Sequence, residues 1–152
     1  MSNPTILVTG ATGKTGGAVA SQLLLRGARV RVLVRTRDAR SRRLHDLGAE
    51  VVIADMFDPL QVEAALAGVS RLYYLPPWHP YMVQSAAVFA TAARRAGVEA
   101  IVGLSQWLAN PSHPSLATRQ NCSWTGSSGW CPTRPTSAWP RPSSPTTTWA
   151  TA

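Results

Sequence analysis

Three glycines with the spacing G-x-x-G-x-x-G, Gly10, Gly13 and Gly16, constrain the fold of this chain more than any other feature. An apolar run, Ile6-Leu7-Val8, precedes them, and apolar residues at helical spacing follow. This order predicts a strand, a tight turn and a helix. The first glycine permits a turn that a Cβ would obstruct, the second lets the backbone approach a ligand, and the third lets the helix pack closely on the sheet.

A turn of this kind directs backbone N–H groups and the positive end of a helix dipole at one point, where a phosphate is stable. The predicted strand before it and helix after it favour a dinucleotide-binding turn over a purely structural one. A P-loop is the competing interpretation, because Gly13-Lys14-Thr15 spells G-K-T. The Walker pattern would also require a glycine at position 8, where this chain has Val8.

The alternation of strands and helices continues along the chain. Strands are predicted over 5–9, 30–35, 51–55, 72–75 and 100–104, and helices over 15–26, 38–47, 59–67 and 82–96. Short connections between alternating elements are typical of an α/β fold with a doubly wound parallel sheet, here in the order 3-2-1-4-5. Ligands of such sheets bind at the carboxyl ends of the strands, so the residues at those ends are the candidates for a site.

Arg35 ends the second predicted strand, where the adenosine ribose of a dinucleotide lies. An acidic residue there suits the 2′-hydroxyl of NAD, whereas an arginine suits the 2′-phosphate of NADP. Arg37 and Arg40 would add positive charge, although a solvated basic helix start is the alternative interpretation. The pattern therefore favours NADP(H) over NAD(H).

The other strand ends supply the remaining candidates. Asp55 and Met56 would flank the adenine, Leu75-Pro76 would pass the nicotinamide side, and Ser105 would face the nicotinamide. His79 is a single loop histidine, and such residues are more often incidental than catalytic, so no catalytic residue is assigned.

Charge and composition argue against several classes of protein. The formal net charge is +8, but eight of the fifteen basic residues lie between Arg26 and Arg43, and no acid follows Glu99. Because the later basic residues are not interleaved with stacking aromatics, we do not expect nucleic-acid binding. Cys122 and Cys131 lack a following histidine at ligand spacing, so no metal site is expected.

No apolar run reaches the roughly 18 residues that a membrane span needs. The first residues, Met1-Ser2-Asn3-Pro4, have neither the basic nor the apolar region of a secretory signal. We therefore expect a cytoplasmic protein without a membrane partner. The sequence leaves its oligomeric state open.

Five stretches together resemble the NmrA-like family of atypical short-chain dehydrogenases/reductases: V-T-G-A-T-G-K-T-G-G, R-V-L-V-R, A-D-M-F-D-P, Y-Y-L-P-P and I-V-G-L-S-Q. The resemblance covers residues 4–120 and implies an NAD(P)H-dependent reductase that transfers hydride to a quinone or similar small acceptor. By this resemblance the pyrophosphate would contact Gly10, Thr12, Gly13, Lys14, Thr15 and Gly16, the 2′-phosphate Arg35, and the adenine Asp55 and Met56. Ala11 within the turn and the strand-end residues Leu75, Pro76 and Ser105 complete the cofactor contacts that we predict.

The Tyr-x-x-x-Lys acid/base pair of ordinary short-chain dehydrogenases is absent, since Lys14 is the sole lysine and lies in the predicted phosphate turn. Many members of the family also lack this pair. Whether the chain is an enzyme therefore stays open at this point, and a non-catalytic redox sensor and an inactive truncated reductase are the alternatives.

The composition changes after residue 120, so we divide the chain into a Rossmann-like domain, residues 1–120, and a tail of low order, 121–152. The tail contains no acid and no Ile, Leu or Val, and Ser, Thr and Pro dominate it. We expect a fifth helix to be lost after its first turn and the fifth strand to become an exposed sheet edge.

A GC-rich back-translation of the tail, read two bases on, gives L-L-V-D-R-L-V-R-L-V, an amphipathic helix, and further on a stretch that resembles the next segment of the family. We therefore hypothesise that residues 121–152 are a frameshift product of a longer reductase gene. The nucleotide sequence tests this hypothesis, because a stop codon in the other frame within a few codons of residue 121 contradicts it.

Overall fold

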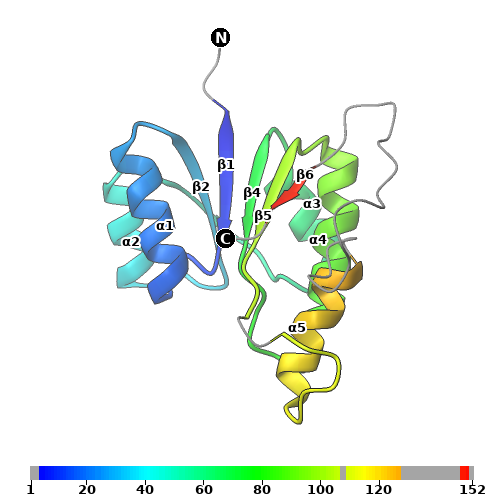
Figure 1. The fold of residues 1–152 in the computed structure, drawn as a ribbon. Helices are drawn as coiled ribbons and strands as arrows, with labels where there is room; N and C mark the ends of the chain where they lie inside the picture. Colours follow the sequence, from blue (N-terminus) through cyan, green and yellow to red (C-terminus); the bar gives the residue numbers. More distant parts are fainter. Residues whose placement is uncertain (1–3, 107–108, 128–147, 151–152) are drawn as a thin grey trace.

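The computed structural model describes residues 4–106, 109–127 and 148–150. They form a parallel β-sheet with helices on both faces (Figure 1). Strands β1 to β6 span Thr5–Thr9, Arg29–Val34, Glu50–Ile53, Arg71–Tyr74, Ala100–Gly103 and Thr148–Ala150. Helices α1 to α5 span Lys14–Leu25, Ala39–Asp46, Pro59–Leu66, Met82–Ala96 and Leu116–Ser127.

The strands lie in the order β3-β2-β1-β4-β5-β6, and every pair is parallel. The predicted order 3-2-1-4-5 of a doubly wound α/β sheet is thereby confirmed. From β1 the chain first builds outward through β2 and β3, and then returns to place β4 on the other side of β1. The carboxyl ends of β1 and β4 therefore form the switch point at which such sheets bind their ligands.

Alternate side chains of the strands enter two separate apolar cores. Val8 and Val32 pack with Ala20 of α1 and Leu44 of α2 on one face. The opposite face is covered by α3 and α4, and Val52 of β3 packs against its core. The buried residues of this core come from the other strands up to β5 and from the helices, and include Leu7, Leu33, Leu72, Tyr74, Ile101, Val62 and Phe89. A central strand covered on both faces accounts for the continuous apolar run in β1.

The starts of α2 and α3 follow from capping side chains within the same segment. The Asp38 carboxylate accepts hydrogen bonds from the backbone N–H groups of Arg40 and Ser41, and the Ser41 hydroxyl accepts one from the Asp38 N–H. Asp58 caps α3 in the same way, with Pro59 at the first helical position. Both starts were predicted from the sequence.

Arg31 on β2 provides a long-range cap at the other end of a helix. Its Nη1 donates to the carbonyls of Ala65 (2.8 Å) and Ala67 (2.7 Å), at the end of α3. Its Nε lies 2.9 Å from a carboxylate oxygen of Glu50 on β3. A cation at this position satisfies terminal carbonyls and interacts favourably with the helix dipole, so it joins the sheet to α3.

The structure differs from the expectation for the C-terminal segment in two places. Helix α5 continues to Ser127, beyond its expected first turn, and β5 pairs with β6 instead of forming the sheet edge. In α5, the side chains of Asn121 and Ser123 donate to the carbonyls of Ala117 and Arg119, each four residues earlier. Such bonds form within the helix and do not depend on an apolar face. The β5–β6 pairing uses main-chain groups, which any sequence without proline offers. Residues 128–147 and 151–152 of the predicted tail lie outside the described residues.

The two capping carboxylates predict how stability depends on pH. The Ser41 N–H and then the Arg40 side chain lower the pKa of Asp38, and the N–H and then the side chain of Gln61 lower the pKa of Asp58. Below about pH 4 the unfolded chain therefore binds more protons than the folded protein, and stability falls as the pH falls. We expect the thermal midpoint to fall less between about pH 6 and about pH 3 in Asp58→Asn, which keeps a cap but does not titrate. An identical fall in the two proteins would contradict this assignment.

Candidate dinucleotide-binding site

The glycine turn connects β1 to α1 at the switch point of the sheet. Gly10 has a φ of 63°, and its carbonyl accepts a hydrogen bond from the Gly13 N–H at 2.9 Å. Gly13 is the extended N-cap of α1 and makes no side-chain capping bond. The N–H groups of Lys14, Thr15 and Gly16 have no acceptor within the helix by its geometry. They form an N-terminus suited to an anion, as predicted from the glycine spacing.

Gly16 allows α1 to approach the end of β1. A Cβ there would lie 2.4 Å from the Gly10 carbonyl oxygen and 2.8 Å from that of Thr9. Both are main-chain atoms, which cannot relieve a clash by changing rotamer as a side chain can. At Gly10 a Cβ would meet the Leu75 side chain at 2.6 Å. At Gly13 it would meet just the Gly10 carbonyl oxygen, at 3.2 Å. Gly13 therefore leaves an uncovered stretch of backbone, the property expected for contact with a phosphate.

Thr9 joins the carboxyl ends of β1 and β4 through its side chain. Its hydroxyl accepts a hydrogen bond from the Leu75 N–H (2.8 Å) and donates to the Leu75 carbonyl (3.1 Å). The β1–β4 pairing ends at Val8 and Tyr73, so the buried hydroxyl continues it where the strands separate. Sequence reasoning missed this role, and the available signal was a hydroxyl residue between an apolar strand and a glycine turn.

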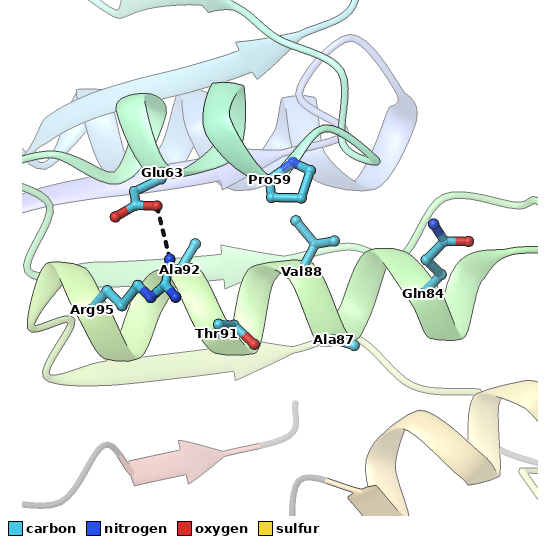
Figure 2. A pocket seen from close by; sticks show the side chains of 8 residues that line it. All are labelled: Pro59, Glu63, Gln84, Ala87, Val88, Thr91, Ala92 and Arg95. Carbon is cyan, nitrogen blue, oxygen red and sulfur yellow. Dashed lines mark hydrogen bonds and ion pairs between the residues drawn. The ribbon is translucent and has the colours of Figure 1, made fainter.

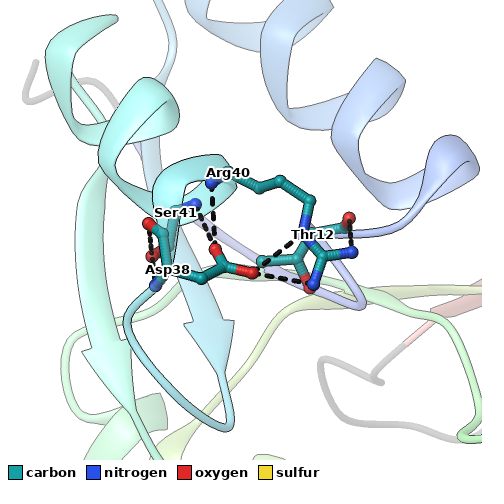
Figure 3. Close-up of polar contacts among 4 residues, drawn as sticks. All are labelled: Thr12, Asp38, Arg40 and Ser41. Atoms are coloured by element: carbon teal, nitrogen blue, oxygen red, sulfur yellow. Dashed lines mark hydrogen bonds and ion pairs between the residues drawn. The ribbon is translucent and has the colours of Figure 1, made fainter.

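The arginines after β2 are all exposed and differ in whether they form an ion pair. Arg40 forms an ion pair with Asp38 at 2.7 Å and donates to the Thr12 carbonyl at 3.1 Å (Figure 3). Arg35 and Arg37 are exposed and form no ion pair with another described residue. The structure therefore places Arg35 at the end of β2, as predicted, with its guanidinium accessible to a ligand.

A chain of hydrogen bonds from β4 and α4 holds the loop after β3 in place. The Tyr74 hydroxyl donates to the Ser85 hydroxyl (3.1 Å), which donates to the Met56 carbonyl (3.2 Å). Burial raises the pKa of Tyr74, so it remains a neutral donor. Asp55 closes the loop by accepting from the Phe57 N–H at 2.9 Å. The Asp55-Met56 segment is thus fixed at the edge where we predicted the adenine.

The remaining predicted site residues occupy different environments. Lys14 and Thr15 are exposed and Thr12 is half-buried, whereas the Ala11 side chain is buried in the core beneath α1. Leu75, Pro76 and Ser105 are half-buried after β4 and β5. These strand ends meet at the same edge of the sheet as the glycine turn.

His79 lies among aromatic rings outside this set. Its ring centroid is 4.9 Å from that of Phe57 and 5.3 Å from that of Tyr81. Its Nδ1 accepts a hydrogen bond from the Tyr81 N–H at 3.2 Å. These contacts orient the ring before α4, and they give it a packing role.

A separate hollow of about 340 Å³ lies between α3 and α4 (Figure 2). Its lining includes Pro59, Val88 and the Glu63–Arg95 ion pair, whose closest atoms are 3.4 Å apart. None of its lining residues belongs to a strand end. The hollow is thus a feature of the helix interface and not of the predicted cofactor site.

Within the described ranges, no group of three His, Cys, Asp or Glu side chains is placed to hold a metal ion. Cys122 is buried in α5, and Cys131 lies outside those ranges. In the same part of the chain, every helix is too short or too polar to cross a bilayer.

Residues 2–113 match the NmrA-like family. The chain belongs to this family. It is 36% identical over 110 residues to an NAD(P)H azoreductase of Xenophilus azovorans, an alignment that covers 72% of this chain and 38% of the relative. It is 33% identical over 132 residues to sterol demethylase protein B of Methylococcus capsulatus, covering 80% of this chain and 39% of the relative.

Among solved structures, the triphenylmethane reductase of a Citrobacter species, complexed with NADP(H), has a similar fold. Its TM-score is 0.68 at 29% identity, over 80% of this chain and 44% of that one. This chain spans about two fifths of the length of the curated relatives that it matches. The shared part is the Rossmann-like sheet that includes the glycine turn.

Gly16→Ala tests the close approach of α1 to β1. The added Cβ would meet main-chain atoms, so α1 must shift, and we expect a loss of about 2–3 kcal/mol in the free energy of unfolding. Gly13→Ala is the matched control, because its Cβ has one contact at 3.2 Å and should lower stability by less than about 1 kcal/mol. Urea denaturation measures both, and equal losses would contradict the assignment.

Proposed function

We propose that this chain binds NADP(H) and acts in hydride transfer to a small aromatic acceptor, the activity of an NAD(P)H-dependent reductase. The observation that supports this most is the uncapped start of α1, where three N–H groups lack an acceptor within the helix, together with the exposed Arg35 at the end of β2. A dinucleotide carries a pyrophosphate for the first feature and, in NADP, a 2′-phosphate for the second. Both features lie at the carboxyl edge of the sheet, after the neighbouring strands β1 and β2.

The charges around the end of β2 support NADP(H) over NAD(H). Asp38 is the nearest carboxylate in sequence to Arg35, and its oxygens accept from two backbone N–H groups and from Arg40. It is therefore already engaged and poorly placed to hold a ribose hydroxyl. Arg35 and Arg37 remain as exposed cations, which favours a phosphate on the ribose.

The class of acceptor is proposed from the relatives. The azoreductase of Xenophilus azovorans and the triphenylmethane reductase of Citrobacter are named for conjugated aromatic dyes, and quinones share that chemistry. When bound, the nicotinamide would supply the hydride, and the protein would supply orientation. Leu75, Pro76 and Ser105 are the described residues that we assign to the nicotinamide side.

A redox sensor without turnover is the second candidate. The single lysine, Lys14, lies in the phosphate turn, so no lysine is available for a Tyr–Lys acid/base pair. Oxidation of NADPH at 340 nm with a panel of quinones, azo dyes and triphenylmethane dyes separates the two functions. Turnover supports the reductase, and saturable NADPH binding without turnover supports the sensor. Absence of any binding would overturn both.

Arg35→Gln tests the proposed 2′-phosphate contact. Loss of one charge-assisted contact at an exposed site should weaken NADPH binding roughly tenfold and leave NADH binding within about twofold. Arg29→Gln is the matched control, since it removes the same charge from the opposite end of the same strand. Tryptophan fluorescence titration gives the affinities, and an equal loss for NADPH and NADH would contradict the assignment.

A further inference from the structure

Arg40 connects two segments that meet at the predicted cofactor site. It lies in the first turn of α2, and its Nη1 donates to the carbonyl of Thr12 in the glycine turn, 28 residues earlier (Figure 3). Its Nε and Nη2 contact the same Asp38 oxygen, at 2.8 Å and 2.7 Å. All three nitrogens of the guanidinium are therefore engaged within the protein.

The Arg40 contact acts on one peptide group of the turn. The Thr12 carbonyl and the Gly13 N–H belong to the same planar peptide unit and point in opposite directions. The N–H donates to the Gly10 carbonyl at 2.9 Å, and the carbonyl accepts from Arg40 at 3.1 Å. The peptide unit is thus held at both ends immediately before the N–H groups of Lys14, Thr15 and Gly16.

Asp38 anchors the guanidinium in this position. Hydrogen bonds from the Ser41 N–H and then from Arg40 lower the pKa of the Asp38 carboxyl, so it is ionised at neutral pH. A phosphate binding directly to Arg40 would have to displace Asp38 or approach its negative charge. Arg35 is exposed and forms no ion pair with another described residue, so a phosphate could bind it without displacing a carboxylate.

We propose that Arg40 is a positioning residue that holds the glycine turn in its anion-binding form and does not contact the 2′-phosphate. This inference rests on the proposed function, because the ligand of the turn is the pyrophosphate of the dinucleotide. The pyrophosphate is common to NADPH and NADH. Loss of a positioning residue must therefore weaken both cofactors alike, whereas loss of a 2′-phosphate ligand weakens NADPH alone.

The test compares Arg40→Gln with Arg42→Gln, an exposed arginine two positions along the same helix that loses the same charge. We expect Arg40→Gln to weaken NADPH and NADH equally, by about threefold to tenfold, as for one surface hydrogen bond to a charged group. Arg42→Gln should leave both affinities within about twofold. Arg40→Lys keeps the charge with fewer directed donors and should recover part of the loss. A loss confined to NADPH, or no loss, would overturn the inference.

A second measurement separates this inference from the proposed function. Within residues 10–16, the amide to follow is the Gly13 N–H, which donates to the Gly10 carbonyl. In the protein without cofactor, its hydrogen exchange should be about threefold to tenfold faster in Arg40→Gln than in wild type or Arg42→Gln. If wild type binds neither cofactor, the proposed function fails, and the exchange rates still decide whether Arg40 positions the turn. Unchanged exchange of the Gly13 N–H would overturn the inference, whatever the cofactor result.

Discussion

The contact between Gly16 and the main chain at the end of β1 determines the geometry of the whole cofactor edge. With no Cβ at this position, α1 lies against the carbonyls of Thr9 and Gly10, which any side chain would displace. The helix axis then directs its unpaired N–H groups at the switch point between β1 and β4. The absence of a Cβ at Gly10 similarly admits Leu75, and the Thr9 hydroxyl holds the backbone of that leucine. The contacts of Thr9, Gly10 and Gly16 thus place α1, the glycine turn and the end of β4 relative to one another.

The electrostatic character of this edge follows from how its carboxylates are used. Asp38, Asp55 and Asp58 each accept backbone N–H groups of their own segment, so they shape loops and helix starts. Asp38 also engages Arg40. The exposed cations and the helix N-terminus are left to face an incoming ligand, which makes the edge complementary to a phosphorylated molecule. The same carboxylates therefore cap local structure and leave this edge with exposed positive charge.

This chain represents only part of the length of its relatives. Strands β1 to β5 and the glycine turn lie within residues 2–113, which match the family. The alignments to the two curated relatives cover about two fifths of the length of each. Helix α5 packs against the segment after β4, where Gln120 donates to the Pro80 carbonyl at 2.7 Å. Figure 1 shows this helix beyond the carboxyl ends of β4 and β5. It therefore lies at the edge of the sheet that also carries the glycine turn.

The sequence by itself determined the strand order, the glycine turn and the starts of α2 and α3. These features depend on residues within a few positions of one another, and the α/β alternation leaves few topologies. It also identified Arg35 and the Asp55-Met56 segment as strand ends. Only the tertiary structure decided the Thr9–Leu75 bridge, the Arg31 cap on α3, the Arg40–Thr12 contact and the extent of α5 and β6. Each of the three side-chain contacts joins residues 28 or more positions apart, and the distance between such residues is set by the crossovers and the packing of the two cores. No local pattern specifies that distance, which is why the predicted site residues were found before the residues that hold them in place.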